Sequence, residues 1–199
     1  MYKLGIDLGG TNIVAGVFEG KELKTHWRFS TDRSKTADEY GILLRSMFDY
    51  CDVPMKEVTS VILSSVVPPV VVPLCHMCER YFGVKPLVVG PGIKNGISIK
   101  YDNPKEVGAD IIAKCVGAFT KYGNGKPMIV IDFGTATTFD VITEKCELLG
   151  VVIAPGIKTS LEGLATKTAQ LPMVELDAPK TVIGKNTKLK LLKFFGGAQ

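Results

Sequence analysis

The chain has 199 residues, 46% of them hydrophobic and 22% charged, which suits a globular protein of one or two domains with a buried core. No stretch approaches the ~20 uncharged apolar residues that a membrane span needs, so we expect no membrane partner. The charged side chains of Lys3 and Asp7 leave the first apolar run too short for a secretory signal, which makes the cytoplasm the expected location.

The basic charge of the chain is confined to its C-terminal end. The net charge is +4, but residues 180–199 contain five lysines and no acidic residue. Residues 1–179 therefore carry a net charge of −1 and offer no basic face to a nucleic acid. We expect no nucleic-acid partner.

The first part of the chain predicts elements in the order βββαβαβα. Three β-prone runs come first, at about residues 2–7, 12–19 and 21–29. The elements that follow are a helix at 36–51, a strand at Val58–Val67, a helix near 73–82, a strand at Leu87–Val89 and a helix opened by Asn103-Pro104. Thr36 and Glu39 form a capping box at the first helix. Pro68-Pro69 is expected to stop the strand before the second helix.

The same pattern starts again at Met128. Three more strands are predicted at about 128–133, 136–143 and 147–153, followed by a helix after Pro155-Gly156. The second unit then lacks a counterpart of the final αβα part of the first. We therefore divide the chain into a first unit, residues 1–126, and an incomplete second unit, residues 127–199.

Each unit begins with a strand that ends in Asp and runs into a Gly/Thr-rich turn. The two strings are Asp7-Leu8-Gly9-Gly10-Thr11 and Asp132-Phe133-Gly134-Thr135-Ala136-Thr137. One such string alone is weak evidence for a functional motif. Two strings in the same context indicate that the unit is duplicated. Both turns lead from strand to strand, whereas Walker and dinucleotide loops lead into a helix.

We interpret both turns as β-hairpins whose tips present backbone N–H groups and a threonine hydroxyl to an anion. The Asp before each turn could hold a cation beside that anion. Two such hairpins across one cleft would hold a nucleoside triphosphate. The repeat therefore predicts a phosphotransferase.

The five cysteines are scattered, at positions 51, 75, 78, 115 and 146, which fits reduced thiols better than a disulfide framework. Cys75 and Cys78 form a Cys-x-x-Cys motif of the kind that metal and redox sites use. The chain has no second Cys or His pair to complete a zinc site. We therefore interpret the two cysteines as small buried hydrophobic residues.

Several longer strings resemble the type III pantothenate kinase family. They include Asp7-Leu8-Gly9-Gly10-Thr11-Asn12 and span residues 7–12, 64–69, 81–92, 101–110, 132–138, 154–157 and 183–187. The family belongs to the superfamily of acetate kinase, sugar kinases, heat-shock chaperones and actin. The resemblance implies an α/β fold of duplicated ribonuclease H-like (actin-like ATPase) units. The second unit would be incomplete here, as in a C-terminally truncated member.

The same resemblance implies that the chain phosphorylates pantothenate with ATP, the first step of coenzyme A biosynthesis. It implies ATP, Mg²⁺ and a monovalent cation, K⁺ or NH₄⁺, as cofactors. It also implies a homodimer that binds pantothenate near the subunit interface.

The resemblance assigns roles to single residues. Asp110 would be the base that deprotonates the pantothenate hydroxyl, Asp132 would hold the monovalent cation, and Asp7 would hold Mg²⁺ through water. The ATP-binding residues would be Asp7, Leu8, Gly9, Gly10, Thr11, Asn12, Ile13, Val14 and Thr135. The substrate-binding residues would be Tyr101, Gly108, Ala109, Asp110, Ile111 and Thr187.

The residues around Asp110 predict its place in the fold. It lies about seven positions into the helix opened at Asn103-Pro104, beside the expected buried stripe Val107, Ile111 and Cys115. Without the resemblance, an acid at such a place is more often a surface or capping residue than a base.

Three features depart from the family pattern. Gly10 stands where the family has Asn, and Ile111 stands where it has Arg. The loss of a charge-assisted hydrogen bond from that Arg costs about 1.5–3 kcal/mol. From about residue 188 the chain becomes a basic tail that resembles nothing in the family.

Two alternatives to an active pantothenate kinase stay open. One is a non-catalytic relative, either a truncated product or a regulatory homologue like the Bvg accessory factor group, which shares the fold. The other is a sugar kinase of the repressor/glucokinase group, prompted by residues 7–12. The cysteine-rich zinc loop of that group is missing here, which counts against it.

Overall fold

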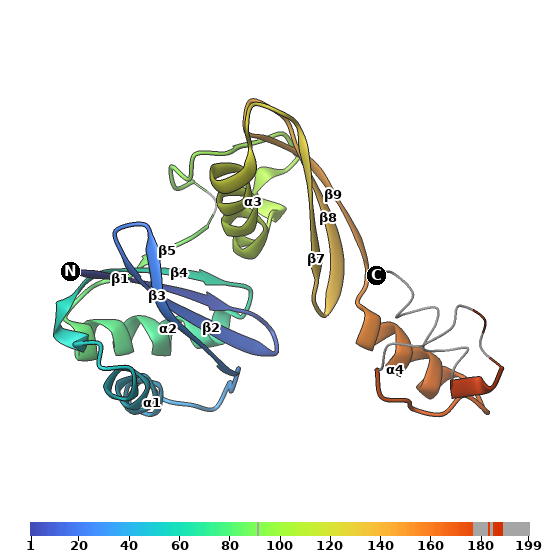
Figure 1. The fold of residues 1–199 in the computed structure, drawn as a ribbon, viewed down its shortest axis with the longest axis horizontal. Coiled ribbons are helices and arrows are strands. Elements are labelled where there is room, and N and C mark those ends of the chain that lie inside the picture. The colour runs from blue at the N-terminus through green and yellow to red at the C-terminus, as the bar shows by residue number, and fades with distance from the viewer. Residues whose placement is uncertain (91, 177–182, 184, 189–199) are drawn as a thin grey trace.

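The structure is a computed structural model that describes residues 1–90, 92–176, 183 and 185–188. It contains two β-sheets and flanking helices, so the predicted α/β class is confirmed (Figure 1). The first sheet is five-stranded, in the order β3-β2-β1-β4-β5. The second sheet is four-stranded, in the order β6-β9-β8-β7. Each sheet contains an antiparallel meander of three consecutive strands, as the sequence repeat predicts.

The first sheet is built from the three predicted opening strands and two parallel additions. The antiparallel strands are β1 (Tyr2–Leu8), β2 (Asn12–Glu19) and β3 (Glu22–Ser30). The parallel strands are β4 (Val58–Ser65), beside β1, and β5 (Leu87–Val88), beside β4. Because side chains alternate along a strand, β1 directs Leu4, Ile6 and Leu8 to one face and Asp7 to the other.

Helices α1 (Ala37–Tyr50) and α2 (Pro68–Met77) lie on one face of the first sheet (Figure 1). Their buried side chains and those of β1, β2 and β4 form one hydrophobic core. The predicted capping box of α1 is confirmed. Thr36 Oγ1 accepts a hydrogen bond from Glu39 N at 3.3 Å, and Glu39 Oε2 accepts one from Thr36 N at 2.8 Å.

Helix α2 begins earlier than the sequence predicts. Strand β4 ends at Ser65, two residues before its expected end, and Pro68 and Pro69 occupy the first positions of the helix. Proline suits these positions because the first helical N–H groups have no partner within the helix. The expected start near residue 73 is wrong, since Pro73 lies inside α2. The chain continues from α2 into a short π-helical stretch, Cys78–Phe82.

The second sheet contains the three strands predicted for the second unit, β7 (Met128–Phe133), β8 (Ala136–Ile142) and β9 (Glu147–Pro155). Helix α4 (Ile157–Lys167) follows, where a helix was predicted. Strand β6 (Ser98–Ile99) was not predicted, and it pairs in parallel with β9. Residues that precede α3 in the chain therefore belong to the second sheet.

Helix α3 (Ala109–Tyr122) contacts both sheets, through β4 of the first and through β7 and β8 of the second. Its start differs from the prediction. Asn103 caps only a 3-10 turn, Pro104–Glu106, and the backbone of Val107 and Gly108 is then extended, with ψ of 121° and 148°. The helix proper begins only after this extended pair.

This shift changes the face that α3 buries. The buried residues of the helix are Ala109, Ile112 and Cys115. The expected buried stripe is partly confirmed: Val107 and Cys115 are buried in the same core, but Val107 precedes the helix and Ile111 is only partly buried.

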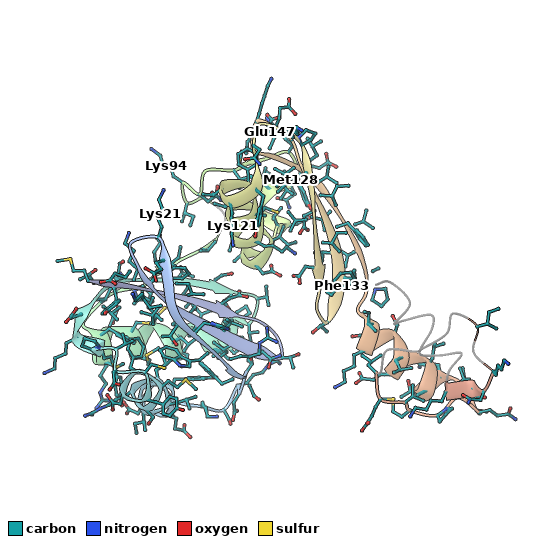
Figure 2. The ribbon with its side chains drawn as sticks, viewed as in Figure 1. Lys21, Lys94, Lys121, Met128, Phe133 and Glu147 are labelled. Carbon is teal, nitrogen blue, oxygen red and sulfur yellow. The ribbon has the colours of Figure 1, made fainter. Side chains whose placement is uncertain are left out.

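One face of the second sheet is left open. Asp7 and Asp132 are each the penultimate residue of their strand, so Ile6 in β1 corresponds to Ile131 in β7. Ile6 is 3% exposed beneath α1 and α2, whereas Ile131 is 49% exposed. Its neighbour Phe133, at the other end of β7 from Met128 in Figure 2, is 68% exposed. No described helix covers this face as α1 and α2 cover the first sheet.

The division of the chain at residue 126 stays a prediction. The sequence repeat separates the two units there, but the second hydrophobic core joins residues from both sides of it, Val89, Ile97 and Ile112 with Ile142 and Leu148.

Among the described residues, no helix has the length and apolar character to cross a bilayer. The basic tail predicted from about residue 188 lies, apart from Lys188, outside the described residues.

Candidate active site

The first predicted phosphate hairpin lies at the end of β1 and β2. Leu8 pairs with Ile13, and Gly9 N donates to Asn12 O at 3.0 Å across the turn. Thr31 holds the turn from the other side, because its hydroxyl donates to Gly9 O at 2.7 Å and its N–H donates to Thr11 O at 2.9 Å. The turn is therefore fixed by its own strands and by the end of β3.

The tip of this hairpin is open to a ligand. Gly10, Thr11 and Asn12 are exposed, and a Cβ built on Gly10 would meet no atom within 4 Å. Gly10 therefore leaves space in front of the backbone. A turn of this kind can direct N–H groups at an anion without a side chain.

The second hairpin lies at the end of β7 and β8 and is held in a similar way. Phe133 pairs with Thr137, and Gly134 N donates to Ala136 O at 3.0 Å. The carbonyl oxygen of Thr135 accepts two hydrogen bonds, from Gly156 N at 2.9 Å and from Thr159 Oγ1 at 2.8 Å. Helix α4 thus begins against this turn.

Gly156 is required by this contact. A Cβ at residue 156 would overlap the carbonyl oxygens of Gly134 and Thr135. The side chain of Thr135, which the resemblance assigns to ATP, is exposed. The backbone of the second tip is therefore held by hydrogen bonds, while the side chain of Thr135 is free to contact a ligand.

Three predicted carboxylates, Asp7, Asp110 and Asp132, come together between the two sheets. Burial is the largest cause that raises the pKa of Asp7, and the negative charges of Asp110 and Asp132 raise it further. The Ser64 hydroxyl and the positive charge of Lys114 oppose the rise. An acid whose pKa is raised by neighbouring negative charges, as Asp7 is, favours the binding of a cation beside it.

Asp110 lies in the first turn of α3, and Gly108 is the N-cap residue. The prediction that Asp110 lies seven positions into a helix is therefore wrong. The error arises because the Val107–Gly108 break separates the 3-10 turn from the helix. An acid is favourable at this end of a helix, where N–H groups have no intrahelical partner. A Cβ on Gly108 would collide with the Asp110 carboxylate.

Lys114, one helical turn after Asp110, is a site residue that sequence reasoning missed. Its ammonium donates to Thr138 Oγ1 at 2.7 Å and lies 2.8 Å from Asp140 Oδ2 and 3.2 Å from Asp132 Oδ2. Burial alone would lower the pKa of Lys114, but the carboxylates of Asp140 and Asp132 outweigh it and raise the pKa.

A sequence signal for this group did exist. Thr138 and Asp140 alternate on strand β8 and so share one face with Asp132 of the paired strand β7. Asp140 is fully buried, and a buried carboxylate needs a positive partner. The lysine in the otherwise apolar stretch of α3 could have been assigned to it.

The predicted substrate residues are only partly brought together. Gly108, Ala109 and Asp110 form the start of α3. Tyr101 is partly buried against the second core, and burial, then the charge of Asp140, raises the pKa of its hydroxyl. Ile111 packs against the same core. The segment at 185–188, coloured red in Figure 1, lies beyond α4 and away from α3. The assignment of Thr187 to the substrate stays a prediction.

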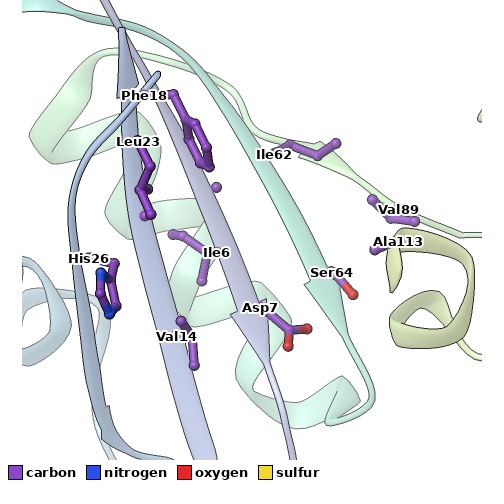
Figure 3. A pocket seen from close by; sticks show the side chains of 12 residues that line it. Ile6, Asp7, Val14, Phe18, Leu23, His26, Ile62, Ser64, Val89 and Ala113 are labelled. Carbon is purple, nitrogen blue, oxygen red and sulfur yellow. The ribbon is translucent and has the colours of Figure 1, made fainter. Parts of the chain in front are cut away.

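An apolar pocket of about 380 Å³ lies beside Asp7, on the face of the first sheet that α1 and α2 do not cover (Figure 3). Its walls include Phe18, Leu23 and Ile62, and α3 closes one side with Ala113. Asp7 lines the pocket where the walls become polar. The site therefore has an apolar wall next to its acids.

The residues fit one of the two implied cations. Among the described residues, no group of three or more His, Cys, Asp or Glu side chains could enclose a metal ion. Mg²⁺ commonly keeps several waters and binds through one or two carboxylates and the substrate phosphates, so Asp7 suits a hydrated Mg²⁺. The implied monovalent cation fits poorly at Asp132, because the Lys114 ammonium already contacts that carboxylate.

The Cys-x-x-Cys motif does not join the site. Cys75 and Cys78 are free, and burial raises the pKa of the Cys78 thiol to about 12. Burial also raises the pKa of Cys75. Thiols held in the neutral form are poor nucleophiles and metal ligands, so the structural interpretation holds.

The sequence is similar to one family of known proteins. The model of the type III pantothenate kinase family matches residues 3–192. A type III pantothenate kinase from an Exiguobacterium species is 54% identical over 184 residues, which cover 92% of this chain and 72% of the relative.

Solved structures support the fold alone, because their sequences are distant. A Campylobacter jejuni protein assigned to the Baf family of transcriptional activators superposes with a TM-score of 0.57 at 16% identity, covering 96% of this chain and 72% of the other. A Ppx/GppA phosphatase from Aquifex aeolicus gives 0.50 at 16% identity, covering 88% and 58%.

Proposed function

Because the chain belongs to the type III pantothenate kinase family, we propose that it transfers the γ-phosphoryl group of ATP to the primary hydroxyl of pantothenate. The product is 4′-phosphopantothenate, and the reaction is the first step of coenzyme A biosynthesis. The observation that carries the proposal is the meeting of Asp7, Asp110 and Asp132 between two similar hairpins.

The two hairpins hold the phosphates of ATP. The exposed tip at residues 10–12 offers backbone N–H groups, and the exposed Thr135 offers a hydroxyl from the second sheet. Phosphoryl transfer depends mainly on positioning and on stabilising negative charge. The hairpins supply the first of these, since strands, Thr31 and Gly156 fix both turns.

Asp110 accepts the proton of the pantothenate hydroxyl. It lies at the start of α3, which contacts strands of both sheets, and its negative charge acts on Asp7 in the first hairpin. A positioned base contributes about 10²–10⁴-fold to the rate. Asp7 would hold a hydrated Mg²⁺, which neutralises phosphate charge when bound.

Pantothenate binds along the start of α3, with Tyr101 and residues 108–111 on the side of the second sheet. The segment at 185–188, which contains Thr187, lies away from α3 in Figure 1. We therefore place Thr187 of a second copy at the same substrate, which requires a homodimer. The cytoplasm, where ATP is made available, is the proposed location.

The test is a coupled assay of ADP release with Mg²⁺, K⁺, ATP and pantothenate. We expect pantothenate-dependent ADP release, and we expect Asp110→Asn to lower kcat by about 10²–10⁴-fold with little change in KM. Asp102→Asn, which changes an exposed acid in the same region, is the matched control and should keep full activity.

Two results would count against the proposal. Turnover that survives in Asp110→Asn would remove this residue from the role of base. A folded dimer without pantothenate-dependent ADP release would favour the non-catalytic alternative.

A further inference from the structure

The surroundings of the Lys114 ammonium resemble a small cation site. An ammonium has three N–H donors, and three side-chain oxygens lie within reach of this one, at 2.7 Å (Thr138 Oγ1), 2.8 Å (Asp140 Oδ2) and 3.2 Å (Asp132 Oδ2). All three oxygens come from the paired strands β7 and β8. Monovalent cations such as K⁺ are likewise held by several oxygen atoms that replace their hydration shell.

The position of Asp140 explains why the lysine is held there. Asp140 is 0% exposed, and its side chain would be an uncompensated buried charge without Lys114. The lysine side chain itself is 19% exposed, so water screens this ion pair only weakly. The ammonium is therefore a fixed part of the site.

Asp132, in contrast to Asp140, is accessible to solvent. Its side chain is 50% exposed and lies at the open side of the cluster, where a dissolved cation could reach it. A second positive charge at this carboxylate would be repelled by the ammonium that already contacts it. Asp132 thus carries a built-in counter-ion.

We propose that the Lys114 ammonium takes the place of the monovalent cation beside Asp132, so that this chain needs neither K⁺ nor NH₄⁺. The proposal rests on the proposed kinase function, because the cation matters only as a partner of bound ATP. Lys114 acts as a positioning residue: it neutralises Asp132 and Asp140 and keeps one positive charge near Asp7 and the phosphate hairpins.

The test compares the wild type with a variant in which the cluster loses its lysine without gaining a lone buried charge. Lys114→Met alone would leave Asp140 unpaired, so the variant is the double substitution Lys114→Met with Asp140→Asn. Lys114→Arg keeps the charge. Lys121→Met, on the same helix at an exposed position, is the matched control.

Two readouts are needed. The first is direct binding of thallium(I), a monovalent cation close to K⁺ in size. Thallium NMR detects this binding to the intact protein in the presence of a non-hydrolysable ATP analogue and Mg²⁺. The second is kcat/KM for pantothenate with KCl replaced by choline chloride. Total salt stays at about 0.1 M so that screening is constant.

We expect the wild type, Lys114→Arg and Lys121→Met to bind no thallium and to keep the same kcat/KM in both salts. The double variant should bind thallium, and K⁺ should raise its kcat/KM by about 10-fold or more, as expected when a lost charge-assisted contact is restored. A lysine with only a structural role would affect stability without creating this dependence on K⁺.

A wild-type protein that binds thallium, or whose kcat/KM rises with K⁺ as much as that of the double variant, would overturn the proposal. The two proposals fail separately. If no salt supports pantothenate-dependent turnover, the proposed kinase function fails, and the thallium comparison between wild type and double variant still decides whether Lys114 occupies the cation position.

Discussion

Asp7 and Asp132 occupy the same place in two hairpins that belong to different sheets. Each is the penultimate residue of its strand, and each pairs across to the second strand of its hairpin, Asp7 with Val14 and Asp132 with Thr138. The negative charge of Asp132 also acts on the pKa of Asp7. The duplicated sequence therefore brings its two acids to one site.

The first prediction concerns the placement of Asp110. Gly108→Ala should lower kcat by up to about 100-fold, because its Cβ would collide with the Asp110 carboxylate and displace it. The backbone of Gly108, with φ −63° and ψ 148°, accepts alanine, so stability should change little. Steady-state kinetics and thermal unfolding measure the two effects.

Gly117→Ala is the control for this substitution. It lies on the same helix with no atom within 4 Å of its added Cβ, and it should stabilise α3 by about 0.5–1 kcal/mol at unchanged kcat. Equal kcat for Gly108→Ala and the wild type would contradict the proposed position of the base.

The second prediction concerns the turn at residues 134–136. Gly156→Ala should cost about 1–3 kcal/mol of unfolding free energy, since the new Cβ overlaps two carbonyl oxygens of the turn. It should also weaken ATP binding, measured by titration with a fluorescent analogue. Gly163→Ala, an open position inside α4, should stabilise that helix by about 0.5–1 kcal/mol and leave ATP binding unchanged. Normal ATP affinity in a destabilised Gly156→Ala protein would separate this turn from the nucleotide.

The residues around α3 explain how far the sequence predicts this site. Each hairpin and its acid belong to one short stretch of sequence, and the stretch occurs twice. Asp7 and Asp132 could therefore be located from the sequence alone. The start of α3 could not, because Asn103-Pro104 has the signals of a helix start and only the extended backbone at Val107 and Gly108 delays it. Lys114 was missed because its partners lie on strands that are distant in sequence.

The helix α2 shows a similar limit. A proline pair is unfavourable inside a strand but favourable in the first turn of a helix. The sequence was interpreted only in the first sense, so the start of the helix at Pro68 was missed. The unexpected β6 depends on pairing with β9, to which it contributes two residues, and such a short strand has no periodic pattern of its own.

The third prediction uses the raised pKa of Asp7. Because burial and neighbouring acids disfavour its charged form in the folded protein, the unfolded protein loses this proton at lower pH than the folded one. Stability from this group therefore falls as pH rises from the ordinary aspartate pKa through the raised one. Asp7→Asn should raise the melting temperature at pH ~7 and remove this part of the decline.

Thermal unfolding of the ligand-free protein between pH ~4 and ~7 measures the effect. Asp49→Asn, an exposed acid on α1, is the control and should follow the wild-type profile. A lower melting temperature for Asp7→Asn at neutral pH would contradict the origin assigned to the pKa shift.

The fourth prediction compares equivalent residues of the two sheets. Ile6→Lys should cost about 3–5 kcal/mol, because it places an unpaired charge beneath α1 and α2. Ile131→Lys should stay within about 0.5 kcal/mol, because the residue is half exposed on the open face of the second sheet. Urea unfolding gives both values, and equal losses would mean that the face at Ile131 is covered in solution.

The claim that one polyphosphate contacts both hairpins is tested most directly by hydrogen–deuterium exchange with a non-hydrolysable ATP analogue and Mg²⁺. We predict slower amide exchange at residues 7–14 and at residues 132–137, with both segments protected over the same range of nucleotide concentration. Protection of one segment, with unchanged exchange in the other at saturating nucleotide, would contradict the account.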